Sequence, residues 1–172
     1  MSKCNLDFDS DFFDSLRRQD EKAFCRLFHG FSGMVYSITV GLLGDKYAAE
    51  DALQEVFVKV FHALPRFQGN KIAPWLGKIA HNHCLDCLRK VGRTDLEILM
   101  EPEKLDLMME ITDSSCELPD FLNSLTLLER EVVILKKVDG LSYKEIADIT
   151  GRTEGTLRNL VLKVLHFLKG EA

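Results

Sequence analysis

The sequence predicts an all-α protein made of two small helical domains that are joined by an acidic linker. Three observations lead to this prediction. The 172 residues include only 4 prolines and 11 glycines, 46% of the residues are hydrophobic, and apolar side chains recur at intervals of three and four along most of the chain. This length suits one large or two small domains, and this composition is sufficient for a hydrophobic core.

Charge divides the chain into three parts. Residues 93–120 hold nine acidic and two basic side chains, so their net charge of −7 is larger in magnitude than the −5 of the whole chain. Because the apolar periodicity is weak there, we expect a linker at 93–118 between domains at 1–92 and 119–172. Residues 66–93 hold six bases against one acid, so we expect this stretch to face a negatively charged partner.

Three amphipathic helices are expected in the first domain, each with a continuous apolar stripe. They cover residues 21–43, 48–64 and 75–90. Gly44 ends the first helix, and Pro65 ends the second because the residue before a proline resists the helical conformation. Residues 67–74 are predicted to form a loop. The preceding segment with Phe8, Phe12 and Phe13 is either a docking arm or, as we prefer, a frayed end.

The second domain contains the sharpest local pattern in the chain. Ser142 and Glu145 form a capping box that starts a short helix, and Gly151 ends that helix. Thr153 caps the next helix, and Leu157 fills the angle between the two, as in a DNA-binding helix-turn-helix. An ordinary pair of packed helices is the alternative. The side chains left for DNA on the outer face are Arg152, Thr153, Glu154, Thr156, Arg158, Asn159 and Lys163.

Taken together, three groups of motifs resemble the extracytoplasmic-function (ECF) sigma factors of bacteria. The resemblance covers about residues 12–92 and 119–169, in the order and spacing of the family. The first group is the segment 49–57, which resembles the helix that binds core polymerase. The second comprises 67–69, 75–82 and 86–90 and resembles the promoter-melting segment, and the third comprises 130–132, 139–147 and 154–156 and resembles the reader of the upstream promoter element.

The resemblance implies a subunit that binds core RNA polymerase and directs transcription from specific promoters. The polymerase-binding residues would be Asp51, Gln54, Glu55, Phe57 and Val58, on a helix face that could otherwise be merely solvated. The residues that bind the minus-ten element would be Lys71, Lys78, Asn82, Asp86, Arg89 and Lys90, with Trp75 mainly a packing anchor. The helix-turn-helix would read the minus-thirty-five element, and an anti-sigma factor would regulate the chain.

Two departures from the family pattern bear on DNA binding. The stretch from Phe67 to Trp75 is about one residue shorter than is common in the family. This difference bears on which DNA base a pocket in that stretch would prefer. Leu160 and Leu165 stand where many members carry arginine. Because each lost phosphate contact removes nearly one unit from the salt slope, we expect modest affinity for promoter DNA without polymerase. A sigma-like decoy that binds an anti-sigma factor without initiating transcription is the alternative function.

Other kinds of chemistry find little support in the sequence. His81, His83, Cys84 and Cys87 could hold zinc or sense oxidants, but their spacing is not that of a closed zinc site, so no metal is expected. No catalytic set or phosphate-binding glycine loop is present, so neither enzyme activity nor a cofactor is expected. The odd cysteine count, the lack of an export signal and the lack of a membrane span predict a cytoplasmic protein without membrane insertion.

Overall fold

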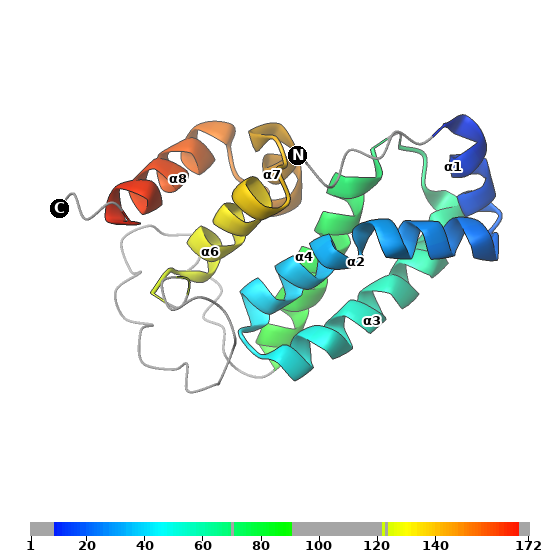
Figure 1. Ribbon diagram of the computed structural model, residues 1–172, viewed down its shortest axis with the longest axis horizontal. Coiled ribbons are helices and arrows are strands. Elements are labelled where there is room, and N and C mark those ends of the chain that lie inside the picture. Colours follow the sequence, from blue (N-terminus) through cyan, green and yellow to red (C-terminus); the bar gives the residue numbers. More distant parts are fainter. Residues whose placement is uncertain (1–8, 70, 91–121, 123, 169–172) are drawn as a thin grey trace.

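The computed structural model describes residues 9–69, 71–90, 122 and 124–168 of the chain, and every regular element in these ranges is a helix (Figure 1). The predicted all-α class is therefore confirmed. The linker expected at 93–118 lies outside the described residues. None of the helices in the described ranges combines the length and the apolarity that crossing a membrane requires.

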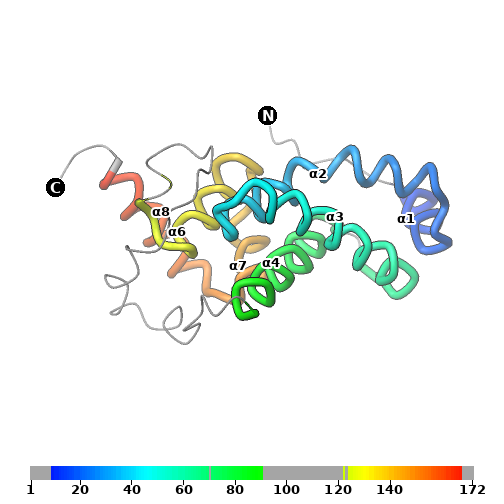
Figure 2. The backbone as a smooth tube through the Cα atoms, turned by 90° about the horizontal axis from the view of Figure 1, so that it is seen from below, coloured from blue at the N-terminus to red at the C-terminus, as the bar shows by residue number. Residues whose placement is uncertain are grey.

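The first domain is a bundle of three long helices with a short helix at one end. Its elements are α1 (Ser10–Arg17), α2 (Glu21–Leu43), α3 (Lys46–Ala63), the 3₁₀ turn η1 (Leu64–Arg66) and α4 (Ile72–Lys90). Helices α2 and α3 are joined by Gly44 and Asp45 alone, and α4 packs against both of them (Figures 1 and 2). The fully buried side chains of Leu27, Phe31 and Leu76 belong to the core between these helices.

Short polar caps explain where the first helices begin. The side chains of Asp9, Asp20 and Asp45 each accept a hydrogen bond from the backbone N–H three residues later, at 2.8, 2.9 and 2.7 Å. Such caps satisfy amide groups that have no partner within the helix. Gly44 ends α2 with a φ of 71°, a left-handed conformation that glycine adopts without strain.

Two expectations for the first domain are corrected by the structure, and a third is confirmed. The segment before α2 is not a frayed end, because α1 is helical and its Phe12 is buried; Phe8 lies outside the described residues. The loop expected at 67–74 is shorter, because α4 begins at Ile72 and accommodates Pro74 in its first turn, where a proline is tolerated. The predicted end of the second helix is confirmed to within one residue, since α3 ends at Ala63 and Pro65 lies in the 3₁₀ turn η1 that follows.

The second domain contains α6 (Leu127–Val133), the π-helical turn η4 (Ile134–Val138), α7 (Tyr143–Thr150) and α8 (Glu154–Leu168). Its helix-turn-helix follows the sequence prediction closely. Ser142 and Glu145 form the capping box, Gly151 has a φ of 72°, and Leu157 is fully buried between the helices. A second capping box, Thr126 with Glu129, starts α6.

The two domains pack against each other. Helix α7 lies against α4, and α6 and η4 lie against α2, so that α4 and α2 each belong to both the bundle and the contact between domains (Figure 2). Buried side chains of both domains form one continuous apolar cluster. A small second cluster of Leu122, Leu125 and Val164 lies within the second domain.

Candidate functional site

The outer face of α3 carries the side chains expected to bind polymerase. Asp51, Gln54, Glu55 and Val58 are all exposed, and 57% of the surface of Val58 is accessible. Phe57 is a correction to the prediction, since only 4% of it is exposed and its ring packs 4.6 Å from that of Phe28. Phe57 precedes the exposed Val58 in the sequence, but its side chain points into the bundle. It therefore packs α3 against α2 and does not offer a surface to a partner.

A hollow of about 270 Å³ adjoins this face, between the end of α2 and the helices α3 and α4. Leu43, Ala52 and Leu88 line it with apolar surface, while Asp51 and Glu55 stand at the same hollow as acids. An apolar cavity beside carboxylates suits a partner that presents an apolar side chain next to a basic one. The sequence predicted the acids but gave no indication of the hollow, which needs three helices to form.

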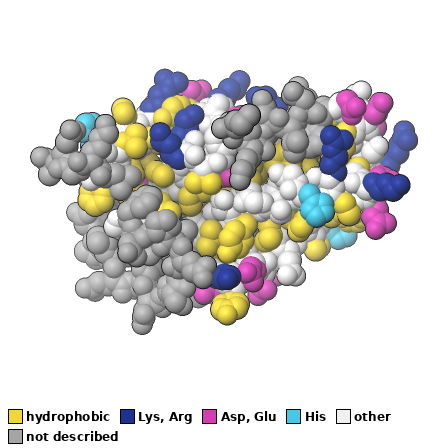
Figure 3. Space-filling view, in the orientation of Figure 1, with side chains coloured by type: hydrophobic (Ala, Val, Ile, Leu, Met, Phe, Trp, Pro, Cys, Tyr) yellow, Lys and Arg dark blue, Asp and Glu magenta, His cyan; other side chains and the backbone are white. Residues whose placement is uncertain are grey.

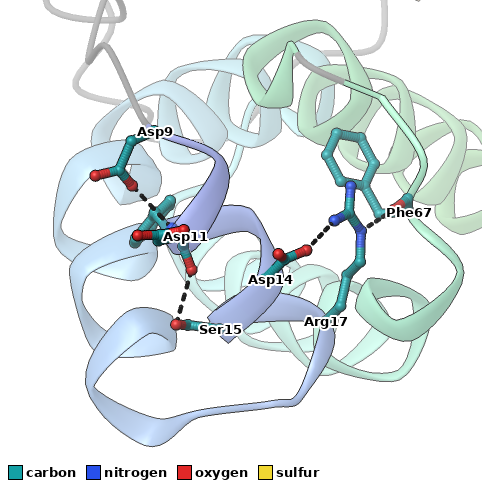
Figure 4. A network of polar contacts seen from close by, with 7 residues as sticks. Asp9, Asp11, Asp14, Ser15, Arg17 and Phe67 are labelled. Atoms are coloured by element: carbon teal, nitrogen blue, oxygen red, sulfur yellow. Dashed lines mark hydrogen bonds and ion pairs between the residues drawn. The ribbon is translucent and has the colours of Figure 1, made fainter.

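Aromatic rings and an arginine fix the start of the loop between η1 and α4. The buried ring of Phe67 lies 4.7 Å from the ring of Trp75 and 5.9 Å from that of Phe13. Arg17 donates a hydrogen bond from Nε to the carbonyl oxygen of Phe67 at 2.8 Å, and its Nη1 pairs with Asp14 at 2.6 Å (Figure 4). Helix α1 therefore holds the loop in place, and Trp75 is the packing anchor that we expected.

An open pocket of about 430 Å³ lies over this aromatic pair. Phe67 and Trp75 form one side of it, and Lys59, His62 and Arg66 contribute basic side chains from α3 and η1. Sequence reasoning missed Lys59 and His62 and counted Arg66 only as part of the basic stretch 66–93, although the spacing of three and four places all three on one helical face. Aromatic surface beside cations is the arrangement that binds unstacked bases and the phosphates between them.

The outer face of α4 presents the remaining residues expected at the minus-ten element. The exposed members are Lys78, Asn82, Asp86, Arg89 and Lys90. Asp86 accepts a hydrogen bond from Arg89 Nη1 at 3.0 Å, so this carboxylate orients the Arg89 side chain. Lys71 is also exposed, but its Nζ lies 3.2 Å from Glu145 Oε1 of the second domain.

The helix-turn-helix exposes Thr153, Thr156, Arg158 and Asn159, while Arg152 and Glu154 are half-buried. Arg158 donates to Glu154 at 3.1 Å and its guanidinium lies 5.4 Å from the centre of the Tyr143 ring. Figure 3 shows lysine and arginine side chains gathered over the corner between α7 and α8. This corner is therefore basic and polar on its outer side.

One exposed residue of α8 that was predicted to contact DNA also has a partner on another helix of the same chain. Lys163 Nζ donates to Glu129 Oε1 at 3.1 Å, which ties α8 to α6. Burial acts to raise the pKa of Glu129, but hydrogen bonds from Thr126 and Lys163 outweigh it and lower that pKa below its usual value. Lys163 therefore has a structural partner in addition to its proposed role at DNA.

The histidine and cysteine side chains of α4 do not meet at one site, because they lie on different sides of the helix and have different partners. Burial, with the Lys59 ammonium 2.7 Å from Nδ1, lowers the pKa of His83 below its usual value, and Cys87 Sγ lies 3.6 Å from His83 Nε2. Burial raises the pKa of the Cys84 thiol to about 12, which keeps it protonated. His81 lies on another side of the helix, with Nδ1 2.6 Å from Glu131 Oε1. Within the described ranges no group of three or more such side chains has an arrangement that could hold a metal ion.

The fold and these surfaces define a two-domain helical protein with a helix-turn-helix, and comparison with known proteins specifies the class further. The family model "Sigma-70 region 2" matches residues 27–94, and "Sigma-70, region 4" matches residues 117–167. The chain belongs to the ECF family of RNA polymerase sigma factors. It is an alternative sigma factor that directs transcription.

Curated relatives show this membership directly. The chain is 31% identical to the RNA polymerase sigma factor CarQ of Myxococcus xanthus, over 80% of this chain and 82% of that one. It is 31% identical to ECF sigma factor SigC of Mycobacterium tuberculosis, over 77% and 75%. It is 34% identical to ECF sigma factor SigE of Mycolicibacterium smegmatis over 74% of this chain, but spans only 52% of that protein.

Two solved structures share the fold. The sigma factor RpoE, in complex with the anti-sigma factor NepR from Bartonella quintana, matches with a TM-score of 0.67 and 25% identity over 87% of this chain and 96% of that one. CnrH, in complex with the cytosolic domain of CnrY, matches with a TM-score of 0.64 over 94% and 97%, at 20% identity. Both matches extend over most of this chain and therefore include parts of both domains.

Proposed function

We propose that this sigma factor binds core RNA polymerase with its first domain, opens the minus-ten element there, and reads the minus-thirty-five element with its second domain. The observation that carries the proposal is that α4 and α8, which lie in the parts of the chain that match sigma-70 regions 2 and 4, both expose polar and basic side chains. The chain acts by binding, without catalysis or a cofactor, and works in the cytoplasm, where core polymerase is present.

Polymerase binding is assigned to the exposed face of α3. Asp51, Gln54 and Glu55 offer oxygen acceptors in a row, and Val58 adds an exposed apolar contact. The adjoining hollow accepts an apolar anchor from the partner. Acceptors on this side match a basic surface of the polymerase, because carboxylates and arginines form strong paired hydrogen bonds.

Opening of the minus-ten element is assigned to α4 and the pocket above Phe67 and Trp75. A flipped base would enter the pocket and lie against the aromatic rings, with Lys59 and Arg66 on the phosphates. Asn82 is exposed on α4 and carries both a donor and an acceptor, so it is suited to a base edge. The other cations of α4 hold the displaced strand through its phosphates.

Recognition of the minus-thirty-five element is assigned to the start of α8. Thr156, Arg158 and Asn159 are exposed there within one helical turn. The N-terminal end of a recognition helix enters the major groove first, where arginine and asparagine discriminate bases. Glu154 and Tyr143 hold Arg158 before DNA arrives, which reduces the entropy lost on binding.

Regulation by an anti-sigma factor also belongs to this proposal. One structural neighbour, the sigma factor RpoE, is in complex with the anti-sigma factor NepR, and another, CnrH, is in complex with the cytosolic domain of CnrY. On α8 of this chain, Leu162 is 55% exposed and Phe167 is 64% exposed, and such apolar groups suit a protein partner. The decoy alternative gains no support from the comparisons.

Run-off transcription with purified bacterial core polymerase tests the proposal. We expect the full chain to start transcripts that core polymerase alone does not, and we expect Asn82→Ala and Arg158→Ala each to reduce the yield at least tenfold. Lys22→Ala, at an exposed position of α2 outside the proposed surfaces, should leave the yield unchanged. Absence of any transcript although the chain binds an anti-sigma factor would favour the decoy function.

A further inference from the structure

We propose that Arg17 and Gln19, near the turn between α1 and α2, are positioning residues for the minus-ten element. They fix the walls of the pocket above Phe67 and Trp75 and thereby determine which base that pocket accepts. The inference rests on the proposed function, because it concerns the pocket that we assign to the flipped base. Both residues precede the segment that matches sigma-70 region 2, which begins at residue 27.

Most walls of this pocket come from the segment in which α3 ends. Lys59, His62 and Ala63 belong to the last turns of α3, Arg66 belongs to η1, and Phe67 follows η1 directly. The last carbonyl groups of a helix have no hydrogen-bond partner within it. A pocket built from such a segment keeps its shape only where other groups bind these carbonyls, and α1 packs against η1 at this place.

The first restraint holds the end of α3. In a continuous helix the carbonyl oxygen of Phe61 would accept a hydrogen bond from residue 65, but Pro65 has no N–H group. Gln19 Nε2 donates to this oxygen at 2.9 Å, from a position 42 residues earlier in the chain. Gln19 therefore supplies the hydrogen bond that Pro65 cannot, and it fixes the turn of α3 that carries His62 and Ala63.

The backbone conformation of Gln19 indicates that its side chain is needed. Its φ is 57°, and no other non-glycine residue in the described part of the chain has a positive φ. Glycine adopts this conformation without strain and is the usual residue where a helix ends in this way. Strained residues of this kind concentrate at ligand-binding sites. Glutamine at this position therefore fits a role in which the amide group matters more than the ease of the turn.

The second restraint holds the aromatic side of the pocket. Arg17 Nε donates to the carbonyl oxygen of Phe67 at 2.8 Å, and Asp14 holds the same guanidinium group through Nη1 at 2.6 Å (Figure 4). The ring of Phe67 lies 4.7 Å from that of Trp75, and a Cβ atom at Gly69 would lie 2.9 Å from Phe67 Cε2. Phe67 is therefore restrained both through its backbone and around its ring.

A pocket with fixed walls discriminates between bases better than one whose walls adapt. A flipped base is accepted or rejected by the fit of its edges and faces, and adaptable walls accept more than one base. A pocket that already has its final shape also loses less entropy when the base enters. We therefore expect the loss of either hydrogen bond to weaken the base preference of the pocket while leaving the polymerase-binding face of α3 unchanged.

Two substitutions separate positioning from direct contact with DNA. Because 36% of its side chain is exposed, a contact with a DNA phosphate is the competing role for Arg17. Arg17→Lys keeps the charge, but a single ammonium group cannot reproduce the fork that binds Phe67 and Asp14 together. Gln19→Gly removes an uncharged amide and favours the existing φ, so the turn between α1 and α2 is kept.

Base preference is measured with holoenzyme reconstituted from the full chain and core polymerase. A start site that the wild-type holoenzyme uses on genomic DNA is randomised across its minus-ten element, and each template carries a barcode within the transcribed region. Sequencing of the transcripts then gives the preference at each position. We expect Arg17→Lys and Gln19→Gly each to lower the preference at one position, the captured base, by about fivefold, which is the factor that one hydrogen bond typically contributes. Preference at the other positions and affinity for core polymerase should match the wild type.

A matched control and the total yield complete the test. Arg18→Lys makes the same change at the neighbouring exposed arginine, which takes part in neither hydrogen bond, and it should keep every preference. If both test variants keep the wild-type preference at every position, even with a lower yield on all templates, the positioning role is refuted and the proposed function stands. A wild-type holoenzyme that starts no transcripts would refute the proposed function, and the positioning role with it.

Discussion

Asp139 is the buried carboxyl group with the clearest effect on stability. It is 5% exposed, its Oδ2 has no hydrogen-bond partner, and burial raises its pKa from 3.8 to about 7. Between pH 3.8 and about pH 7, Asp139 in the folded protein therefore keeps a proton that the same group has released in the unfolded chain. The free energy of unfolding falls as the pH rises through this range. Above pH 7 the full cost of burying the ionised Asp139 carboxylate is present.

Replacing this carboxyl group tests that account. We expect Asp139→Asn to raise the melting temperature by several degrees at pH 8, because the amide cannot ionise, and the gain should shrink toward pH 4. Asp148→Asn, at an exposed position on α7, is the control and should show no such trend. Thermal unfolding over pH 4 to 8 makes the measurement, and a constant difference across that range would contradict the account.

Cys84 and Cys25 should differ sharply in reactivity. Cys84 is fully buried and its thiol stays protonated, with a pKa of about 12, whereas Cys25 is exposed. Because the thiolate is the reactive form, iodoacetamide should modify Cys25 in the native protein at least a hundredfold faster. Peptide mapping over time measures both rates, and equal rates would show that the core around Cys84 opens readily.

At the scale of single residues, the sequence predicted which side chains are exposed more reliably than which residues they contact. Arg158 was expected on the outer face of its helix from the helix-turn-helix pattern and Asn82 was assigned through the family resemblance, and both side chains are exposed. Phe57 was wrongly assigned to the polymerase surface, because a motif match does not separate side chains one helical position apart. The contact of His81 with Glu131 joins residues 50 positions apart, and no local pattern indicates such a contact.

The short helix α7 depends on its cap more than on its length. Ser142 accepts from the Glu145 backbone N–H at 3.3 Å, and the Glu145 carboxylate accepts from the Ser142 N–H at 2.9 Å. Burial acts to raise the pKa of Glu145, but the Ser142 hydrogen bonds and the Lys71 ammonium outweigh it and lower that pKa below its usual value. This contribution to stability is therefore present at neutral pH and is lost as the pH falls through that lowered pKa.

Removing the cap should weaken the whole helix-turn-helix. We expect Ser142→Ala to lower the free energy of unfolding by about 1 kcal/mol at pH 7, measured in urea. Ser37→Ala is the control, since its hydroxyl bonds to a carbonyl within α2 and caps nothing. Equal stability of the two variants would mean that α7 is held by packing alone.

The start of α8 should account for part of the salt dependence of DNA binding. Replacing Arg158 with alanine in the holoenzyme should reduce the slope of log affinity against log salt by about one unit if the side chain contacts a phosphate. If it contacts a base edge, affinity should fall by about 1–3 kcal/mol and selectivity for the minus-thirty-five sequence should weaken. Lys22→Ala is the control and should change neither the salt slope nor the affinity. If the Arg158 variant binds DNA as the wild type does, Arg158 of α8 does not contact the promoter.

At the scale of elements, local chemistry was sufficient to predict most boundaries. Periodicity and caps located α2, α3, α7 and α8 to within a few residues, because each has a stripe and a capping residue of its own. The turn η4 was not predicted, since a π-helical turn follows from packing against α2 and not from local propensity. Helix α1 was also missed, because Phe13 of this helix packs against Phe67, which lies more than 50 residues further along the chain.

At the scale of the molecule, the sequence predicted two domains but not their contact. The helical periodicity of each half and the acidic stretch between them are local properties. The contact between the domains includes two glycines, Gly41 and Gly77, that meet Ile134 and Ile149 of the other domain, and a glycine inside a helix gives no sign of what approaches it. Three-dimensional packing was needed to show that α7, which precedes the recognition helix α8, lies against α4.

The central claim is that this chain gives core polymerase its choice of start sites. The most direct measurement is to sequence the 5′ ends of transcripts made on genomic DNA by bacterial core polymerase, with and without the purified chain. We predict new start sites that share one sequence element near minus ten and another near minus thirty-five. Start sites that are the same in both samples, although the chain has bound the polymerase, would contradict the claim.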